Sequence, residues 1–275
     1  MKKVFISIDM EGISTIVDWA EVDRNNSEYA HTRKLMVSDL NAAIEGALEA
    51  GAEEVVVSDA HGGMRNLRPE DVHEAAYLVR GSPKPNSMME GIEEGFDAAL
   101  YVGYHSMKGT ENGVCSHTIS GSAVQAVYVN GVETGEFGLN SALAGYYGVP
   151  SVFLAGDYAA TEEAKRFVPG ITTATVKWGR GRHSAKCLHP KAAARLIKTR
   201  VAEALQGEPL PPRVVEPPIT IKAVFANEVM ADVASLMPSL KRVGGVAVEG
   251  TFDDYQQAVN ALRASIYMAS ATLRR

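Results

Sequence analysis

The N-terminal half of the chain alternates short β-rich runs with helical patterns, and this alternation constrains the fold most. From Tyr29 to Ala50 apolar residues recur every three or four positions, which predicts a helix that Gly51 is suited to end. Strands are predicted around this helix and farther along the chain, at 3–8, 54–58, 98–103, 151–154 and 172–177. Strands separated by helices indicate βαβ units, so the sequence predicts an α/β fold with a mainly parallel sheet flanked by helices in three layers.

Further helices are expected in the second half of this region, at 139–147, 161–167 and 191–205. The pair Asn130-Gly131 interrupts an alternating run at 125–132, and Asn-Gly is the strongest short signal for a β-hairpin. A hairpin is therefore expected before the helix at 139–147.

A proline-rich stretch at 208–218 marks the clearest change in composition. Five prolines in these eleven residues favour a stiff, extended connector. Beyond it, β-type and helical patterns alternate in the ranges 219–225, 227–236, 245–249 and 253–271. We therefore expect a catalytic α/β domain over 1–207, a connector over 208–218 and a small β-α-β-α subdomain over 219–275.

Composition excludes several classes of protein. The 275 residues are 46% hydrophobic and 22% charged, as in ordinary globular chains, and the formal net charge of −6 argues against a nucleic-acid partner. No apolar run has the length of a membrane span, and the first residues do not resemble a signal peptide. Two cysteines, Cys115 and Cys187, cannot form a disulfide framework. We expect a soluble cytoplasmic protein that acts on a small substrate.

Potential metal ligands follow three of the predicted strands. Asp9 and Glu11 follow the first strand, His61 follows the second, and His105 follows the third. The carboxyl ends of parallel strands meet at one edge of a sheet, where α/β proteins bind their ligands. The four side chains are therefore expected to converge, although each residue alone is more typical of a turn, a cap or a solvated loop.

Two neighbouring carboxylates at a dry sheet edge repel each other unless a cation compensates them. A donor set of imidazole and carboxylate without thiolate suits zinc, with manganese or another divalent ion as an alternative. Glu136 opens the helix that follows the hairpin and is the fifth candidate. With one carboxylate shared between the ions, the five residues would fit a two-metal site.

His117 lies in a polar loop, and two roles are possible for it. By itself it is typical of a hydrogen-bonded loop histidine, but close to a metal site it could be a nucleophile or a proton shuttle. Cys115 is an alternative nucleophile for which the sequence shows no activating partner. Arg180 and Arg182 form a basic loop, which is either solvated surface or a clamp for a substrate carboxylate.

The motif Ser7-Ile-Asp9-Met-Glu11-Gly12 resembles the Ser-x-Asp-x-Glu-Gly signature of the D-aminopeptidase family of the DppA type, zinc peptidase family M55. Other stretches similar to family positions follow in order along essentially the whole chain. They are Ser58-Asp-Ala-His61, Lys84 to Gly91, Val102-Gly-Tyr-His105, Ser116-His117, Gly135 to Asn140, Ala155-Gly-Asp157, Lys186 to Pro190, Phe225-Ala-Asn227 and Met237-Pro238.

The resemblance implies a zinc-dependent aminopeptidase that removes N-terminal D-amino acids such as D-Ala from short peptides. It implies two Zn²⁺ per subunit, with Asp9 as the bridging ligand and His117 as the catalytic residue, proposed in the family as a nucleophile. Glu11, His61, His105 and Glu136 would complete the ligand set. The partners implied are a short D-amino-acid-containing peptide and further copies of the chain in a ring of two stacked pentamers, a decamer.

Two other functions are compatible with the residues alone. One is a metal-dependent hydrolase of another small amide, a dipeptide or a phosphoester, although a phosphatase would be expected to carry more cationic groups than Arg180 and Arg182. The other is a non-catalytic dipeptide-binding protein, for which five ligand-type side chains would be superfluous.

Overall fold

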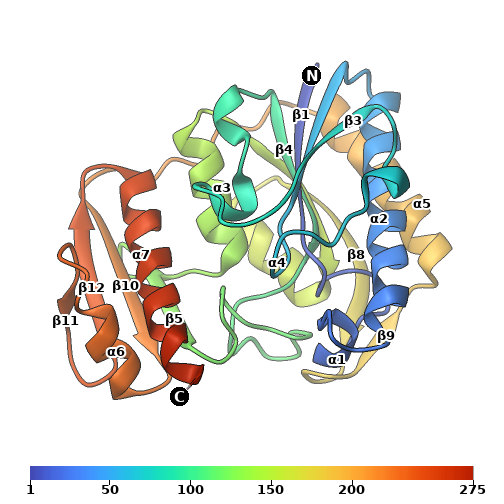
Figure 1. The fold of residues 1–275 in the computed structure, drawn as a ribbon. Helices are drawn as coiled ribbons and strands as arrows, with labels where there is room; N and C mark the ends of the chain where they lie inside the picture. The colour runs from blue at the N-terminus through green and yellow to red at the C-terminus, as the bar shows by residue number, and fades with distance from the viewer. Residues whose placement is uncertain (275) are drawn as a thin grey trace.

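A computed structural model describes residues 1–274. Within them a seven-stranded sheet has the order β3-β2-β1-β4-β7-β8-β9 (Figure 1). The neighbouring strands from β3 to β8 are parallel, and the edge strand β9 is antiparallel to β8. The strands are β1 Lys3–Ile8, β2 Glu54–Asp59, β3 Ala76–Val79, β4 Ala98–Tyr104, β7 Ser151–Asp157, β8 Thr172–Gly179 and β9 Ala185–Cys187.

Two apolar layers enclose this sheet, and side chains alternate between them along each strand. Val4, Ile6 and Ile8 of β1 pack towards α2 and α5, whereas Phe5 packs on the opposite side towards α3 and α4. The first helices are α1 Trp19–Val22, α2 Tyr29–Glu49, α3 Glu136–Tyr146, α4 Tyr158–Phe167 and α5 Pro190–Gln206. The three-layer arrangement around a mainly parallel sheet matches the fold predicted from the sequence.

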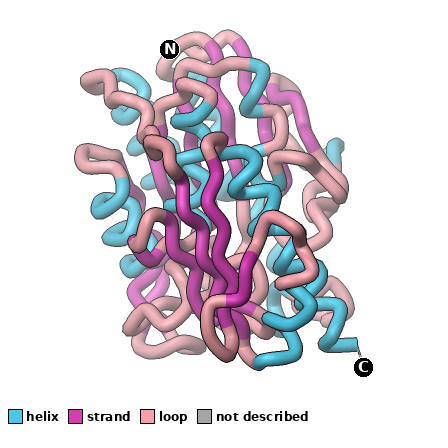
Figure 2. The backbone as a smooth tube through the Cα atoms, turned by 90° about the vertical axis from the view of Figure 1, so that its left-hand side faces the viewer, coloured by secondary structure: helices cyan, strands magenta, loops and turns pink. Residues whose placement is uncertain are grey.

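A second, antiparallel sheet of order β11-β12-β10-β5-β6 lies beside these layers (Figure 2). It joins the expected hairpin, β5 Val124–Val129 and β6 Val132–Glu133, to strands near the end of the chain. Those strands are β10 Ile219–Phe225, β11 Lys241–Arg242 and β12 Ala247–Phe252, and the last helices are α6 Glu228–Ala234 and α7 Tyr255–Ser270. Short 3₁₀ turns occur at Pro69–Asp71, Ser87–Met89, Ile92–Glu94 and Ala271–Arg274.

Helix α7 packs on β10 and β12 and also contacts α3, so the last part of the chain and the first sheet share one apolar core. The side chain of Arg263 in α7 is buried and donates hydrogen bonds to the carbonyl oxygens of Lys84 (3.0 Å) and Pro85 (2.6 Å). The predicted division at 208–218 remains a prediction. None of the helices within residues 1–274 is long and apolar enough to cross a membrane.

Candidate metal centre

The carboxyl ends of β1, β2 and β4 and the first residue of α3 bring the five predicted ligands together. Asp9, Glu11, His105 and Glu136 are buried, and His61 is close to burial, with 13% of its side chain exposed. Strands β2 and β4 flank β1 in the sheet, so their ends meet where β1 runs out. The convergence predicted from the strand ends is therefore present in the structure.

Asp9 lies between the two histidines. Its Oδ1 is 3.3 Å from Nδ1 of His61, and its Oδ2 is 3.4 Å from Nε2 of His105. Glu11 stands on the His61 side, with Oε2 at 3.0 Å from Nδ1, and Glu136 stands on the His105 side, with Oε2 at 3.5 Å from Nε2. The arrangement forms two half-sites that share one carboxylate.

Backbone carbonyls fix the orientation of both histidines. Nε2 of His61 is 3.1 Å from the carbonyl oxygen of Val22, and Nδ1 of His105 is 3.0 Å from that of Ser106. A carbonyl can only accept, so each of these ring nitrogens carries a proton, whether the imidazole is neutral or charged. In the neutral ring the other nitrogen directs a lone pair at the carboxylates, as in histidines that bind metal ions.

This donor arrangement fits divalent ions. Within residues 1–274 the buried Nε2 of His105 has no hydrogen-bond partner, and in the neutral ring its lone pair faces carboxylates that cannot donate a proton to it. Two buried groups of three residues each offer ligand atoms that lie within 4.8 Å of one another inside the group. One group is Asp9, Glu11 and His105, and the other is His105, His117 and Glu136. Imidazole nitrogen and carboxylate oxygen are the donors that zinc accepts.

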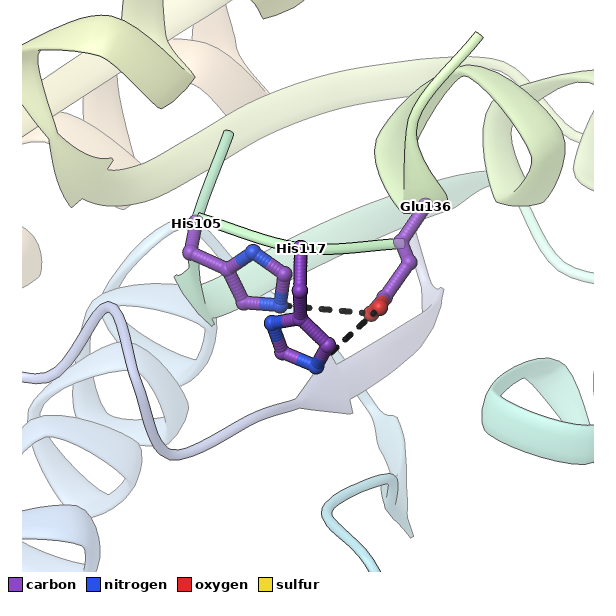
Figure 3. A group of neighbouring side chains, drawn as sticks. All are labelled: His105, His117 and Glu136. Atoms are coloured by element: carbon purple, nitrogen blue, oxygen red, sulfur yellow. Dashed lines mark ion pairs between the residues drawn. The ribbon is translucent and has the colours of Figure 1, made fainter. Parts of the chain in front are cut away.

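His117 lies against the same cluster (Figure 3). Its ring stacks on that of His105, with centroids 4.1 Å apart and planes inclined by 13°. Nδ1 is 3.1 Å from the carbonyl oxygen of Cys115, while Nε2 faces Glu136 Oε1 at 3.6 Å and Glu11 Oε1 at 4.0 Å. Its free nitrogen therefore points to the cluster, in a position suited to a ligand or to a group that reacts beside one.

The charges of the cluster strongly favour added positive charge. Burial alone would lower the pKa of His61 and His105, but the adjacent carboxylates hold both values well above the usual one. Burial also disfavours the ionised form of Asp9, yet the two adjacent imidazoles keep the pKa of this carboxyl well below the ordinary range. His117 differs, because burial and the charge of His105 lower its pKa and favour the neutral ring.

Comparisons with known proteins agree with this geometry. Residues 1–264 match the model of a peptidase family described as D-aminopeptidase. The chain is 38% identical to a D-aminopeptidase of Bacillus subtilis (strain 168) over 272 residues, which is 98% of either chain. The chain belongs to the D-aminopeptidase family.

A solved structure of this family has the same fold throughout. It is the Zn-dependent D-aminopeptidase DppA from Bacillus subtilis, described as a self-compartmentalizing protease, with a TM-score of 0.95, 37% identity and 98% of each chain covered. The family membership, the α/β fold class and the enzyme class predicted from the sequence are thereby confirmed. The comparisons favour neither a different hydrolase nor a non-catalytic binding protein.

The other candidate residues lie at the edge of the site or outside it. Cys115 is buried, and burial raises the pKa of its thiol to about 11, which disfavours a thiolate nucleophile. Arg182 donates to the carbonyl oxygen of Ser116, next to His117. Arg180 lines a separate surface cavity of about 740 Å³ that contains none of the predicted ligands.

Two aromatic residues near the cluster were not predicted from the sequence. Trp19 meets the His117 ring edge-on at a centroid distance of 5.1 Å, and Tyr267 of α7 lines the cavity of about 180 Å³ that contains Asp9, His61 and Glu136. Tyr267 comes from a part of the chain where the sequence carries no functional motif. Only the packing of α7 over the site reveals it.

Proposed function

We propose that this chain is a zinc-dependent aminopeptidase that hydrolyses N-terminal D-amino acids, such as D-Ala, from short peptides. Membership of the D-aminopeptidase family supports this activity, and zinc dependence is a property of the related DppA structure. The observation that carries the proposal is the free nitrogen of His105, a buried lone pair held towards two carboxylates by the hydrogen bond of its other nitrogen.

The two half-sites suggest how two Zn²⁺ ions would be held in each subunit. Asp9, Glu11 and His61 would hold one ion, and Asp9, His105 and Glu136 the other, with Asp9 as the bridge. Zinc bound there would supply a Lewis acid that polarises the scissile carbonyl and offsets the charge developing on its oxygen.

His117 is the residue we propose as catalytic. Its lowered pKa keeps the ring neutral near pH 7, and its hydrogen bond to the carbonyl of Cys115 leaves Nε2 free to attack the carbonyl carbon or to carry a proton. In either role hydrolysis consumes one water, breaks the first peptide bond, and releases the N-terminal D-amino acid and the shortened peptide.

The function is tested by a hydrolysis panel of matched D- and L-aminoacyl peptides with added zinc, combined with elemental analysis of the protein. We expect cleavage of D-Ala peptides, about two zinc ions per chain, and loss of activity after chelation that zinc restores. Activity confined to L-peptides would refute the stereochemistry, and full activity in the zinc-free protein would refute the metal mechanism.

His117→Ala is expected to lower kcat on a D-Ala peptide about 10²–10⁴-fold, the usual size of a general acid–base contribution. Zinc content should remain as in the unsubstituted protein if His117 reacts with substrate. A parallel loss of bound zinc would instead identify it as a ligand, and near-normal turnover would remove it from the mechanism. Steady-state kinetics and elemental analysis on the same preparations separate these results.

We also propose that the chain assembles into a ring of two stacked pentamers and acts in the cytoplasm. Self-compartmentalization of the related DppA structure supports an assembly of copies, and the two free thiols of Cys115 and Cys187 suit a reducing compartment. Light scattering coupled to size-exclusion chromatography should give a mass ten times that of the chain.

A further inference from the structure

Lys177 in β8 is fully buried, and its ammonium group contacts a single loop. Nζ donates hydrogen bonds to three backbone carbonyl oxygens, those of Glu11 at 2.5 Å, Ile13 at 2.9 Å and Ile16 at 2.6 Å. These bonds use all three protons of the ammonium. Lys177 therefore binds the backbone of the 11–16 loop, which lies more than 160 residues before it in the sequence.

This lysine is not half of an ion pair within the described chain. The hydrogen-bond partners found for Nζ are carbonyl oxygens, and the charge of Asp157 acts on it without a direct bond. A buried ammonium without a bonded counter-ion is costly, so only close dipoles can hold it in place. A cage of backbone carbonyls around one positive charge is also how proteins bind a monovalent metal cation.

The loop that Lys177 binds has little regular secondary structure. Residues 9–18 form turns, and their backbone is attached to the sheet through Gly12, whose N–H donates to the carbonyl oxygen of Gly103 at 2.7 Å. The N–H of Ser14 is bound by the carboxylate of Asp39, and Lys177 holds three carbonyls of the loop. The peptide group between Glu11 and Gly12 is thus bound at both of its polar atoms, the oxygen by Lys177 and the N–H by Gly103, and these two bonds constrain where the carboxylate of Glu11 reaches the cluster.

We propose that Lys177 is a positioning residue whose ammonium acts as a built-in monovalent cation, fixing the 11–16 loop so that Glu11 is held in its metal-binding position. The inference rests on the proposed function in one respect, the role of Glu11 as a zinc ligand. Lys177 contacts neither the carboxylates of the cluster nor the substrate cavity, so it acts only through the backbone it holds.

The first test is Lys177→Met, which keeps an unbranched apolar stem as far as the ε position but removes the charge and the three donors. Substitution of residues that orient metal ligands typically weakens metal binding 10- to 100-fold, and we expect a loss of zinc affinity in this range. Affinity is measured without peptide, by competition with a chromophoric chelator. Lys198→Met is the matched control, because Lys198 is partly exposed and pairs with Glu45 and Glu49 at the surface; it should leave zinc affinity unchanged.

A second variant separates positioning by charge from a general loss of packing. Lys177→Ala leaves a space lined by three carbonyls, and ethylammonium or K⁺ in the buffer should enter it and restore zinc affinity. Choline at equal concentration has no N–H donor and is too large, so it should restore nothing. Lys177→Met should not respond to ethylammonium, because the methionine side chain fills the space.

Unchanged zinc affinity in Lys177→Met, or failure of both cations to restore Lys177→Ala, overturns the proposal. If Lys177→Met does not fold, recovery of folded Lys177→Ala in ethylammonium but not in choline supports the proposal, and equal behaviour in both overturns it. If the wild-type protein binds zinc but cleaves no D-peptide, only the proposed activity is refuted. If it does not bind zinc, both the proposed activity and the role of Lys177 are refuted.

Discussion

At the scale of single residues, two glycines allow the end of β1 to lie directly against the end of β4. A Cβ on Gly12 would stand 2.0 Å from the carbonyl oxygen of Tyr104, and one on Gly103 would stand 2.2 Å from that of Asp9. Gly103 also has a φ of +69°, which glycine adopts without strain. The close approach of Asp9 and His105 therefore depends on the absence of two side chains.

Gly12→Ala is expected to push the 9–16 loop away from β4, because the atoms in its way are backbone and cannot rotate aside. We expect a loss of stability of about 1–3 kcal/mol, the usual cost of overpacking, together with reduced zinc content. Urea unfolding and elemental analysis measure the two effects. Gly245→Ala, where no atom lies within 4 Å and φ is not positive, should change stability by less than about 0.5 kcal/mol. Equal effects in both variants would contradict the steric argument.

Asp39 gives a pH dependence that can be isolated. Burial raises the pKa of its carboxyl from 3.8 to about 7, with partial compensation from the backbone N–H of Ser14. Because the folded pKa is raised, its stabilising contribution is complete below about pH 4 and is lost as the pH rises through about 7. Asp39→Asn cannot ionise, so the difference in unfolding free energy, variant minus wild type, should increase by up to about 4 kcal/mol between pH 4 and pH 8. Urea titrations at several pH values test this; a difference independent of pH would show that Asp39 stays ionised throughout.

The candidate site could be predicted from the sequence where its residues follow strands. Asp9, Glu11, His61 and His105 follow from the rule that parallel strands end at one edge, which requires no knowledge of side-chain packing. Glu136 and the role of His117 depended on the family resemblance, since one begins a helix and the other lies in an irregular loop.

At the scale of elements, the long periodic segments were predicted correctly and the short edge strands were not. The helix expected at 29–50 is α2, and the strands expected at 3–8 and 98–103 are β1 and β4, to within a residue. Strands β3, β9 and β11 were missed, because two to four residues at a sheet edge carry no periodicity. Their structure is determined by pairing with a neighbour rather than by local sequence.

Helix α4 begins at Tyr158, three residues before the predicted start, because Asp157 caps it. Its Oδ1 accepts from the N–H of Ala160 at 3.0 Å, while Oδ2 accepts from that of Val114 at 2.8 Å, in the loop that leads to His117. Asp157→Ala removes both bonds and should cost about 2–4 kcal/mol, combining the loss of a cap with one buried N–H left without a partner.

Asp157→Asn is the matched comparison, since its amide oxygen can still accept one of these bonds. It should lose less stability than the alanine variant in thermal or urea unfolding. If both substitutions cost the same, the carboxylate charge rather than its hydrogen bonds would be the stabilising feature.

At the scale of the whole molecule, the C-terminal segment completes the structure around the candidate metal centre. Strand β10 pairs with β5, the Tyr255 hydroxyl donates to the carbonyl oxygen of Leu139 in α3, and Tyr267 lines the metal-centre cavity. The sequence predicted the elements of this segment other than β11, but not their pairing partners, because pairing between residues about 90 positions apart leaves no local pattern.

A chain ending at residue 207 is therefore expected not to fold stably, even though 208–218 is predicted to be a connector between domains. Removal of β10 exposes one edge of β5 and the apolar face that Ile221 and Leu262 cover. Circular dichroism and size-exclusion chromatography of the truncated chain test this. A monodisperse, cooperatively unfolding fragment would support an autonomous N-terminal domain instead.

The candidate ligands begin at Asp9 and end at Glu136, and they lie at the ends of three strands and the start of one helix. None of these segments holds a complete set of donors, so a chain emerging from the ribosome cannot form the centre until α3 has been synthesised and the sheet has closed. We therefore expect metal to bind at these residues only after the sheet and α3 have folded, so that a partly folded chain carries no complete site.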